Sequence, residues 1–253
     1  MSKCPHLNLG FKVVSQASAW RRTYSFATPA RRLPALRGRR FRGRAGAVTM
    51  AHAPASQPTM NPTRAQLRRG MRDRRRALAA PARIAAAEAL AERLLALPFA
   101  PRSGHVAGYW ASDGEIPLHA WQLRLPRGLR YCLPVLHADA TLRFAPWSPG
   151  APLVANRYGI PEPDVSGDAL LEPAQLDLVV VPLVAFDQRC HRLGMGGGWY
   201  DRSFAFRATQ PAPPHLVGAG FSFQQVAPIA AESWDVALDA VCTESDTFCL
   251  VTA

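Results

Sequence analysis

Lysine is absent from residues 61–253 of this 253-residue chain, and aspartate and glutamate are absent from residues 1–60. These two absences divide the formal net charge of +12 unevenly along the chain. Of the 30 Lys and Arg residues, eleven lie in residues 1–60, which leaves 19 arginines against 18 acids in residues 61–253. The excess of positive charge therefore belongs to the first 60 residues. The net charge of the remaining chain gives no support for nucleic-acid binding.

Residues 1–60 are rich in Arg, Ala, Pro and Gly and show no sustained apolar period. Such a segment cannot bury enough apolar surface to offset its chain entropy, so we expect a disordered basic tail. An organellar targeting peptide, a secretory signal and a start codon placed too early are three explanations for it. The exclusive use of arginine in residues 61–253 indicates a GC-rich coding bias, which favours the third explanation, with Met50 or Met60 as the natural first residue.

The five cysteines are scattered and form no C-x-x-C pair, which argues against a disulfide framework or a zinc site and fits a reducing compartment. The longest apolar run, residues 178–186, is much shorter than the roughly 20 residues that cross a bilayer as a helix. We therefore expect no membrane segment. A cytoplasmic location is favoured over a mitochondrial one.

The pattern of apolar residues predicts an α/β fold. Residues 63–99 are typical of two helices, the first capped by Thr63 and the second beginning near Pro81. The β-branched run 176–186 is typical of a central strand in a parallel sheet, because it is apolar on both faces. Further strands are expected at 105–111, 129–136, 141–147, 216–223 and 240–244, helices at 118–125 and 200–208, and a long loop from 148 to about 175. This alternation predicts a single domain over residues 61–253, a three-layer α/β sandwich with a mainly parallel, doubly wound (Rossmann-like) sheet.

Residues 192–201, RLGMGGGWYD, contain four glycines in five consecutive positions. The stretch matches neither standard nucleotide motif, because a P-loop needs a lysine and a dinucleotide turn needs the spacing G-x-G-x-x-G. It keeps the property that these motifs share, since bare backbone lets consecutive N–H groups approach a phosphate. Arg192 supplies a cation, and Asp201 supplies a carboxylate for Mg²⁺. We favour a phosphate site over the alternative, a flexible glycine turn.

The longer segment 181–204, VPLVAFDQRCHRLGMGGGWYDRSF, resembles the signature of the 5-formyltetrahydrofolate cyclo-ligase family, also called 5,10-methenyltetrahydrofolate synthetases. That signature runs P-x-x-x-F-D-x-x-G-x-R-L-G-x-G-x-G-Y-Y-D. Further segments in family order extend the resemblance over about residues 61–250: RAQLR, SDGE, YCLPVLH, NRYGIPEP and ESWDVALDAVCTES.

Two positions depart from the family pattern. Cys190 stands where the family has a turn glycine, which strains the turn if that position has a positive φ. Trp199 replaces the first of two tyrosines, which keeps a flat ring and loses a hydroxyl group. These departures leave open a second hypothesis, a relative of the family that binds folate or a nucleotide without turnover. A third hypothesis is nucleic-acid binding through residues 1–60, with the steep salt dependence that phosphate contacts bring.

The resemblance implies an enzyme that uses ATP to convert 5-formyltetrahydrofolate to 5,10-methenyltetrahydrofolate, with release of ADP and phosphate. ATP phosphorylates the formyl oxygen, N10 attacks the activated carbon, and phosphate departs. Such phosphoryl transfer requires positioning and charge neutralisation and no covalent nucleophile. Mg²⁺ is the implied cofactor, and ATP is a co-substrate. The implied partners are these two small molecules, with no nucleic acid and no membrane, and a monomer is favoured.

The resemblance also implies roles for individual residues. Arg192 and Tyr200 are the implied catalytic residues, and Asp201 and Asp235 are the implied Mg²⁺ ligands. The implied ATP contacts are Arg64, Arg68, Arg192, Gly194, Met195, Gly196, Gly197, Gly198, Trp199 and Tyr200. The implied folate contacts are Trp110, Glu115, Met195, Gly196, Gly197, Gly198 and Trp199.

Several of these residues have a purely structural alternative. Arg64 and Arg68, four residues apart on one helix face, are also typical of a solvated charged face. Glu115 is also typical of an acid in a turn or at a helix start, and Trp110 of a core residue. The side chains of Arg192 and Asp201 are expected to be exposed. The remaining arginines of the first helix are interpreted as surface residues: Arg69, Arg72, Arg74, Arg75 and Arg76.

Overall fold

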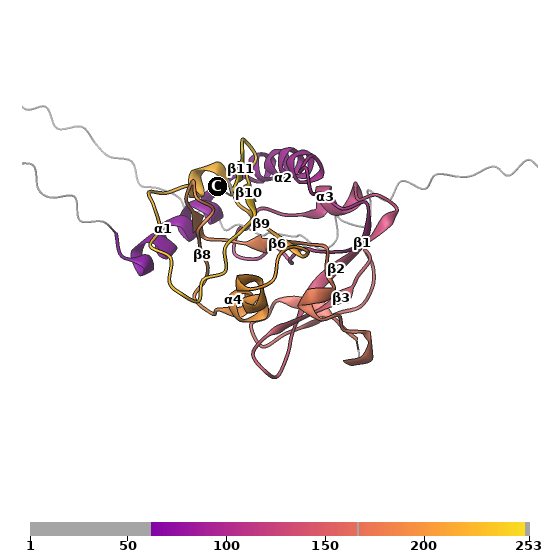
Figure 1. Cartoon of the computed structure of the whole chain (residues 1–253). Helices are drawn as coiled ribbons and strands as arrows, with labels where there is room; N and C mark the ends of the chain where they lie inside the picture. Colours follow the sequence, from indigo (N-terminus) through magenta and orange to yellow (C-terminus); the bar gives the residue numbers. More distant parts are fainter. Residues whose placement is uncertain (1–61, 166, 251–253) are drawn as a thin grey trace, which may run out of the picture. The chain divides into compact units, whose positions relative to one another are not determined.

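The computed structural model describes residues 62–165 and 167–250 (Figure 1). The predictions of a disordered tail over residues 1–60 and of a natural start at Met50 or Met60 lie outside these residues. The main sheet consists of β1 (Ser103–Ala107), β2 (Gly128–Leu136), β3 (Leu142–Pro146), β6 (Leu178–Pro182), β9 (His215–Ala219), β10 (Ala240–Cys242) and β11 (Thr247–Cys249). The helices are α1 (Arg64–Ala77), α2 (Ala80–Leu95), α3 (His119–Leu123) and α4 (Trp199–Ser203).

The seven strands lie in the order β11-β10-β9-β6-β1-β2-β3. The four inner pairings, β10 with β9, β9 with β6, β6 with β1 and β1 with β2, are parallel. The two edge strands, β3 and β11, are antiparallel to their neighbours. The prediction of an α/β fold with a mainly parallel sheet is therefore confirmed.

Two crossovers in opposite directions make the sheet doubly wound. The chain passes from β1 through α3 to β2, and from β6 through α4 to β9 in the other direction. Because such crossovers are right-handed, opposite directions place their helices on opposite faces. The packing agrees, since α2 and α3 share a core with Val106 and Val180, whereas Phe204 at the end of α4 shares one with Val179. Figure 1 shows α2 and α3 above the sheet and α4 below it.

The two crossover connections start from the neighbouring strands β1 and β6 and run in opposite directions, so the loops that follow these strands diverge. In open α/β sheets a crevice forms at such a switch point, outside the carboxyl ends of the strands. The loop after β1, residues 108–118, contains Glu115, and the chain after β6 leads to the glycine stretch at 194–198. The fold therefore brings both predicted binding segments to one edge of the sheet.

Local signals set the helix starts and the central strand as predicted. The Thr63 hydroxyl accepts the Gln66 N–H at 3.2 Å, and the Gln66 side chain accepts the Thr63 N–H at 2.8 Å, which completes a capping box at α1. Pro81 lies in the first turn of α2, where its missing N–H breaks no helical bond. Val179 and Val180 of β6 are fully buried, one on each face of the sheet.

The predicted strand 176–186 is shorter than expected. β6 ends at Pro182, and β7 (Ala185–Phe186) pairs with β8 (Arg192–Leu193) in a separate two-stranded sheet. The Gln224 side chain donates to the carbonyl oxygens of Leu183 and Val184, at 3.0 and 2.8 Å. Because these bonds satisfy backbone groups outside the sheet, a run that is apolar throughout can leave the sheet and stay buried.

The short strands β4 (Leu153–Ala155), β5 (Pro161–Pro163) and β11 were not predicted, and one helix is shorter than predicted. The expected loop from 148 to 175 contains β4 and β5, which pair as a hairpin. β11 follows β10 at the sheet edge. The predicted helix 200–208 ends at Ser203 and continues as a 3-10 turn over Ala205–Ala208. These pieces are three to five residues long, too short to show a period in the sequence.

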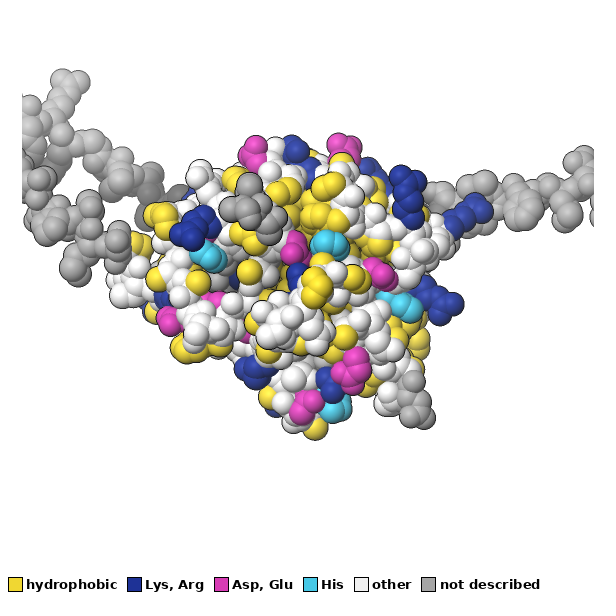
Figure 2. All heavy atoms as spheres, viewed as in Figure 1, with side chains coloured by type: hydrophobic (Ala, Val, Ile, Leu, Met, Phe, Trp, Pro, Cys, Tyr) yellow, Lys and Arg dark blue, Asp and Glu magenta, His cyan; other side chains and the backbone are white. Residues whose placement is uncertain are grey.

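The surface matches the near-neutral charge of this part of the chain. On the face drawn in Figure 2, basic and acidic side chains are interspersed over the described residues. Among residues 62–165 and 167–250, no helix has the length and apolar character needed to cross a membrane.

Gly104 in β1 lies against a carboxylate that leaves no space for a side chain. Its φ is +100°, and a Cβ there would lie 2.1 Å from Asp177 Oδ2. The same oxygen accepts the His105 N–H at 2.7 Å, so the carboxylate cannot move away without losing this bond. We therefore predict that Gly104→Ala lowers the free energy of unfolding by at least about 2 kcal/mol, as measured by urea denaturation.

The control is Gly70→Ala in α1, where the space around the added Cβ is open. Replacement of a glycine inside a helix by alanine should raise stability by about 0.5–1 kcal/mol. Equal stabilities for the two variants would show that the contact with Asp177 does not constrain β1.

Candidate functional site

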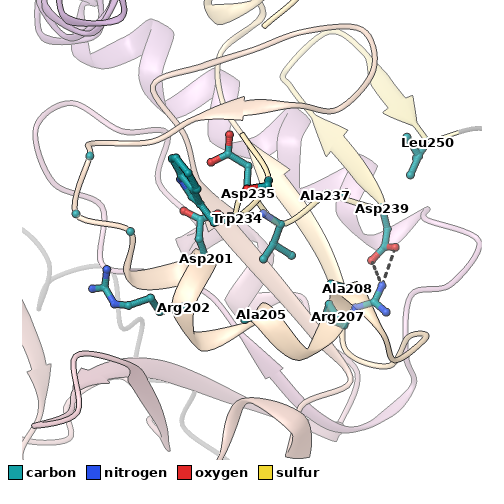
Figure 3. Close-up of a pocket in the computed structure, with 15 residues that line it drawn as sticks. Asp201, Arg202, Ala205, Arg207, Ala208, Trp234, Asp235, Ala237, Asp239 and Leu250 are labelled. Carbon is teal, nitrogen blue, oxygen red and sulfur yellow. Dashed lines mark hydrogen bonds and ion pairs between the residues drawn. The ribbon is translucent and has the colours of Figure 1, made fainter. Parts of the chain in front are cut away.

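A cavity of about 790 Å³ opens beside the glycine stretch (Figure 3). Its lining comes from residues 196–198, from α4 with the turn that follows it, and from the loop 233–239. Asp201 and Asp235 both line it, together with Trp234. In Figure 3 the ion pair of Arg207 with Asp239 lies at the other end. The cavity is thus bordered by bare backbone and by charges of both signs.

The glycine stretch is fixed to α1 by one of the predicted phosphate ligands. Arg68 Nε donates to the Gly194 carbonyl oxygen at 2.8 Å. Gly196 has a φ of +98°, and a Cβ built on it would lie 3.7 Å from Arg68 Cζ. The guanidinium therefore lies directly against the bare backbone, and the two features predicted to contact phosphate are neighbours in the structure.

Two predicted phosphate-binding arginines are each close to a predicted metal ligand. Arg192 Nη2 donates to Asp201 Oδ1. Arg64 Nη2 lies 4.0 Å from Asp235 Oδ2, and it also donates to the Ala230 carbonyl oxygen. Opposite charges at these distances stabilise each other. A ligand that carries both phosphates and a divalent cation can offer phosphate oxygens to the arginines and the cation to the aspartates. The cavity is therefore suited to a metal-bound anion.

Arg192 also connects the loop 233–239 to α4. Its Nη1 donates to the Val236 carbonyl oxygen at 2.6 Å, and the Val236 N–H donates to Asp201 Oδ1 at 3.3 Å. The Arg192 side chain is only 7% exposed, against 24% for Asp201. The expectation that both side chains are exposed is therefore wrong for Arg192, because that guanidinium is enclosed by the backbone it bonds.

The residues at the cavity fit Mg²⁺. Mg²⁺ prefers oxygen ligands and is commonly held by one or two carboxylates, with substrate phosphates and water in the remaining positions. Asp201 and Asp235 offer two carboxylates on the wall of one cavity. Within the described ranges, no three His, Cys, Asp or Glu side chains gather into a group that would hold a metal by themselves. The donor set therefore suits an ion that arrives with a nucleotide.

Glu115 is close enough to Tyr200 to influence the pKa of its hydroxyl group. The Ser112 N–H donates to Glu115 Oε2 at 3.0 Å, and Arg75 Nη1 lies 3.8 Å from Glu115 Oε1. Burial raises the pKa of Glu115, and the bond from Ser112 and the charge of Arg75 oppose this rise. Burial and the nearby Glu115 raise the pKa of Tyr200, so its hydroxyl group keeps its proton at neutral pH. One group can accept hydrogen bonds and the other can donate one.

The predicted aromatic contacts differ in their surroundings. Trp110 is half-buried and packs edge to face on Trp147, with ring centroids 5.9 Å apart. This packing matches the structural alternative of a core residue. Two guanidinium groups lie over the Trp199 ring, that of Arg157 at 5.0 Å and that of Arg202 at 5.3 Å from its centroid. Cation–π contacts thus orient the ring that replaces a family tyrosine.

Cys190 has a φ of +62°, so the expected strain at this family glycine position is present. The side chain is buried, with its Sγ 3.5 Å from the Phe248 carbonyl oxygen. The Asp187 carboxylate supports the turn by accepting the N–H groups of Arg189 and His191, at 2.9 and 3.0 Å. Neighbouring bonds and packing of the sulfur therefore hold a backbone conformation that glycine adopts more easily.

Sequence reasoning missed the role of one arginine in α1. Arg75 was interpreted as a surface residue, but it is fully buried. Its partners are Asp113 at 3.1 Å and the Leu183 carbonyl oxygen at 3.2 Å. The spacing of residues on α1 could have revealed this burial, because Leu67, Met71 and Arg75 follow one another at intervals of four on the inner face. A charged residue on an apolar face is the feature that would have identified it.

The predicted site residues fall into two neighbouring groups. The cavity collects the glycines at 196–198 with Asp201 and Asp235, and Arg64, Arg68 and Arg192 border it through their contacts. Trp110 and Glu115 lie after β1 and are not part of this cavity lining within the described residues. Tyr200 connects the groups, since it is in α4 and close to Glu115.

Comparisons of the sequence with a family model and with known proteins point to the same family. Residues 60–244 match the model of the 5-formyltetrahydrofolate cyclo-ligase family. The 5-formyltetrahydrofolate cyclo-ligase of Escherichia coli (strain K12) is 37% identical over 181 residues, which cover 69% of this chain and 97% of that protein. The protein of the same name from Haemophilus influenzae is 35% identical over 178 residues, covering 69% and 94%.

Two solved structures share the fold. The structure of Aquifex aeolicus 5,10-methenyltetrahydrofolate synthetase has a TM-score of 0.64 and 27% identity, covering 75% of this chain and 94% of that chain. A 5,10-methenyltetrahydrofolate synthetase from Mycoplasma pneumoniae has a TM-score of 0.57 and 23% identity, covering 72% and 99%. At its lower identity, the second structure supports the fold alone.

The strain at Cys190 can be measured by comparing two substitutions. Both Cys190→Ala and Cys190→Gly remove the buried sulfur, but only glycine relieves the positive φ. The left-handed conformation costs about 1–2 kcal/mol for a residue with a Cβ, and glycine loses part of this gain through its more flexible unfolded state. We predict that the glycine variant has the higher free energy of unfolding, by about 1 kcal/mol, in urea denaturation. An alanine variant more stable than the glycine variant would show that the turn is unstrained.

Proposed function

Because the chain belongs to the 5-formyltetrahydrofolate cyclo-ligase family, we propose that it converts 5-formyltetrahydrofolate and ATP to 5,10-methenyltetrahydrofolate, ADP and phosphate. Membership of the family supports the folate substrate. The observation that supports ATP is the cavity beside the glycine stretch, which combines bare backbone, arginines and two carboxylates. A nucleotide with its metal ion needs this combination.

ATP binds with its phosphates against residues 194–198. The N–H groups of this bare segment are available to phosphate oxygens, and Arg68 beside it adds a positive charge. Arg64 and Arg192 bond phosphate oxygens after exchange of their carboxylate partners. Asp201 and Asp235 hold Mg²⁺, which neutralises phosphate charge when bound.

The reaction requires that the formyl oxygen of the folate become a good leaving group. The γ-phosphoryl group moves from ATP to the formyl oxygen, and ADP is released. N10 of the folate then attacks the formyl carbon, the carbon–oxygen bond breaks with departure of phosphate, and N10 loses its proton. Arg192 stabilises the charge that develops on the transferred group, because its enclosed guanidinium already has a fixed direction.

The folate binds at the crevice beside this cavity. The Glu115 carboxylate accepts hydrogen bonds from N–H groups of the pterin ring. The protonated Tyr200 hydroxyl donates a hydrogen bond to the reacting region, and Trp199 at the start of α4 contacts the ring system. The site therefore acts by binding, orientation and charge stabilisation, without a covalent nucleophile.

The same proposal includes the location and the organisation of the chain. Cys132, Cys190 and Cys242 are buried free thiols, which supports a reducing compartment such as the cytoplasm. We propose residues 61–253 as the catalytic unit and the monomer as its working form. A folate- or nucleotide-binding relative without turnover is the alternative function.

The test of the function is the conversion itself. The full chain is incubated with ATP, Mg²⁺ and 5-formyltetrahydrofolate, and the absorbance of the methenyl product is followed. We predict ATP-dependent product with one ADP formed per methenyl group, and no product when ATP is omitted, because the formyl oxygen leaves only after phosphorylation. Binding of both substrates without product would support the binding relative.

The two carboxylates have a separate test. We predict that Asp201→Asn and Asp235→Asn each raise the Mg²⁺ concentration for half-maximal rate by about tenfold or more, because an amide loses the charge that binds the ion. Glu232→Gln is the matched control, since Glu232 lies in the same loop and 3.5 Å from Arg64 but is not a proposed ligand. A Mg²⁺ dependence equal in all three variants would remove the proposed metal site.

A further inference from the structure

Arg75 is a fully buried arginine at the crevice between β1 and β6. A buried guanidinium is costly unless it is paired and hydrogen-bonded, so its partners show what it is built to hold. Those partners come from both sides of the switch point. On the β1 side they are Asp113 at 3.1 Å and Glu115 at 3.8 Å, and on the β6 side the Leu183 carbonyl oxygen at 3.2 Å.

The backbone around Arg75 is equally constrained. The Arg83 side chain from α2 donates to the Arg75 carbonyl oxygen at 3.1 Å. Gly114, between the two acids, lies so close to α1 that a Cβ would be 2.9 Å from the Arg75 carbonyl carbon. The loop after β1 is therefore packed directly on the helix turn that carries the guanidinium, and a shift of Arg75 would move that loop.

We infer that Arg75 is a positioning residue for the folate: from α1 it holds the Glu115 carboxylate and the chain after β6 in one arrangement, and thereby sets the affinity for 5-formyltetrahydrofolate without touching it. This inference rests on the proposed function, because Glu115 is the proposed contact with the pterin ring. It assigns a function to a residue that lies outside the cavity lining.

The charges around Glu115 explain why a cation is needed there. Asp113 on the same loop repels a negative charge on Glu115. The nearby Tyr109 and Tyr200 supply no positive charge, and the Tyr109 hydroxyl donates to the Ile116 carbonyl oxygen at 2.7 Å. Burial also disfavours the ionised carboxylate. Arg75 is the cation within salt-bridge distance of Glu115 among the described residues. Without it, the carboxylate that accepts pterin N–H groups is less stable.

Asp113 offers a matched control for the loss of an arginine. Arg76 Nε donates to Asp113 Oδ1 at 2.5 Å, as Arg75 donates to the other oxygen. The Arg76 side chain is half exposed, and its contacts are with Asp113 and Asp73. Arg76→Gln therefore disturbs the same acidic loop while it leaves Glu115 and Leu183 in contact with Arg75.

The experiment compares Arg75→Lys, Arg75→Met and Arg76→Gln in the full chain. Binding of 5-formyltetrahydrofolate and of ADP is followed by tryptophan fluorescence, and KM is measured for both substrates. Loss of a charged hydrogen-bond partner predicts that Arg75→Met weakens folate binding by about tenfold to a hundredfold, with ADP binding changed less than about twofold. Arg75→Lys, which keeps the charge without the planar fork, gives a smaller loss, and Arg76→Gln gives almost none.

The pH dependence separates positioning from a general effect on folding. Folate binding needs ionised Glu115, so it is lost as the pH falls through the pKa of that group. Removal of the Arg75 charge raises this pKa, so the acid limb of kcat/KM for the folate shifts to higher pH in Arg75→Met. The limb stays near its original position in Arg75→Lys and Arg76→Gln. Each rate is corrected for the reaction without enzyme.

A Glu115→Gln background decides whether Arg75 acts through Glu115. There the added Arg75→Lys substitution should change folate affinity by less than about threefold, and this comparison stands even if Arg75→Met does not fold. Additive losses in this background, or equal losses of folate and ADP binding, would overturn the inference. Wild-type protein that binds no folate would instead refute the proposed function. If the wild-type protein turns over its substrates and the Arg75 variants bind folate as the wild type does, only the role of Arg75 is refuted.

Discussion

Charge compensation at the switch point of the sheet is the constraint on which the site depends. An ionised side chain in a partly buried crevice is stable only with a partner of opposite sign, because desolvation costs several kcal/mol per ion. Arg75 is paired with Asp113 and Glu115, Arg192 with Asp201, and Arg64 with acids of the loop that follows residue 230. These pairs join α1, the loop after β1, α4 and the loop 233–239. Ion pairs as well as apolar packing therefore hold these segments together.

The winding of the sheet decides where these charges can meet. The right-handed crossovers from β1 and β6 move apart, so the loops after these two strands diverge at one edge of the sheet, where Arg75 of α1 contacts both. The helix α1 comes before the first strand and supplies Arg64, Arg68 and Arg75 to the same edge. Because Arg68 and Arg75 are seven residues apart, about two turns, one helix contacts both the glycine stretch and the loop after β1.

Much of the fold and part of the site could be predicted from the sequence. Thr63, Pro81 and the valines of β6 act locally or through a strong period, so their elements were recognised. The glycine stretch was recognised from its composition and the spacing of its flanking charges. The exit of the chain from the main sheet after Pro182 was not, because the backbone there is bonded by Gln224, about forty residues away. Likewise the burial of Arg75 depends on acids in another loop. The composition of the charged helix, with its seven arginines, does not distinguish Arg75 from the others.

The two departures from the family pattern bear on the choice between an enzyme and a binding relative. Cys190 has a strained backbone, but the Asp187 carboxylate stabilises the turn that contains it. Two residues later, Arg192 keeps its hydrogen bonds to Asp201 and Val236. Trp199 lacks the family hydroxyl, but its ring is oriented by Arg157 and Arg202. Phosphoryl transfer depends on the placement of charges, and neither departure removes a charge or displaces a pair. The charged residues that the proposed reaction uses are therefore all present, which favours the proposed enzyme over the binding relative.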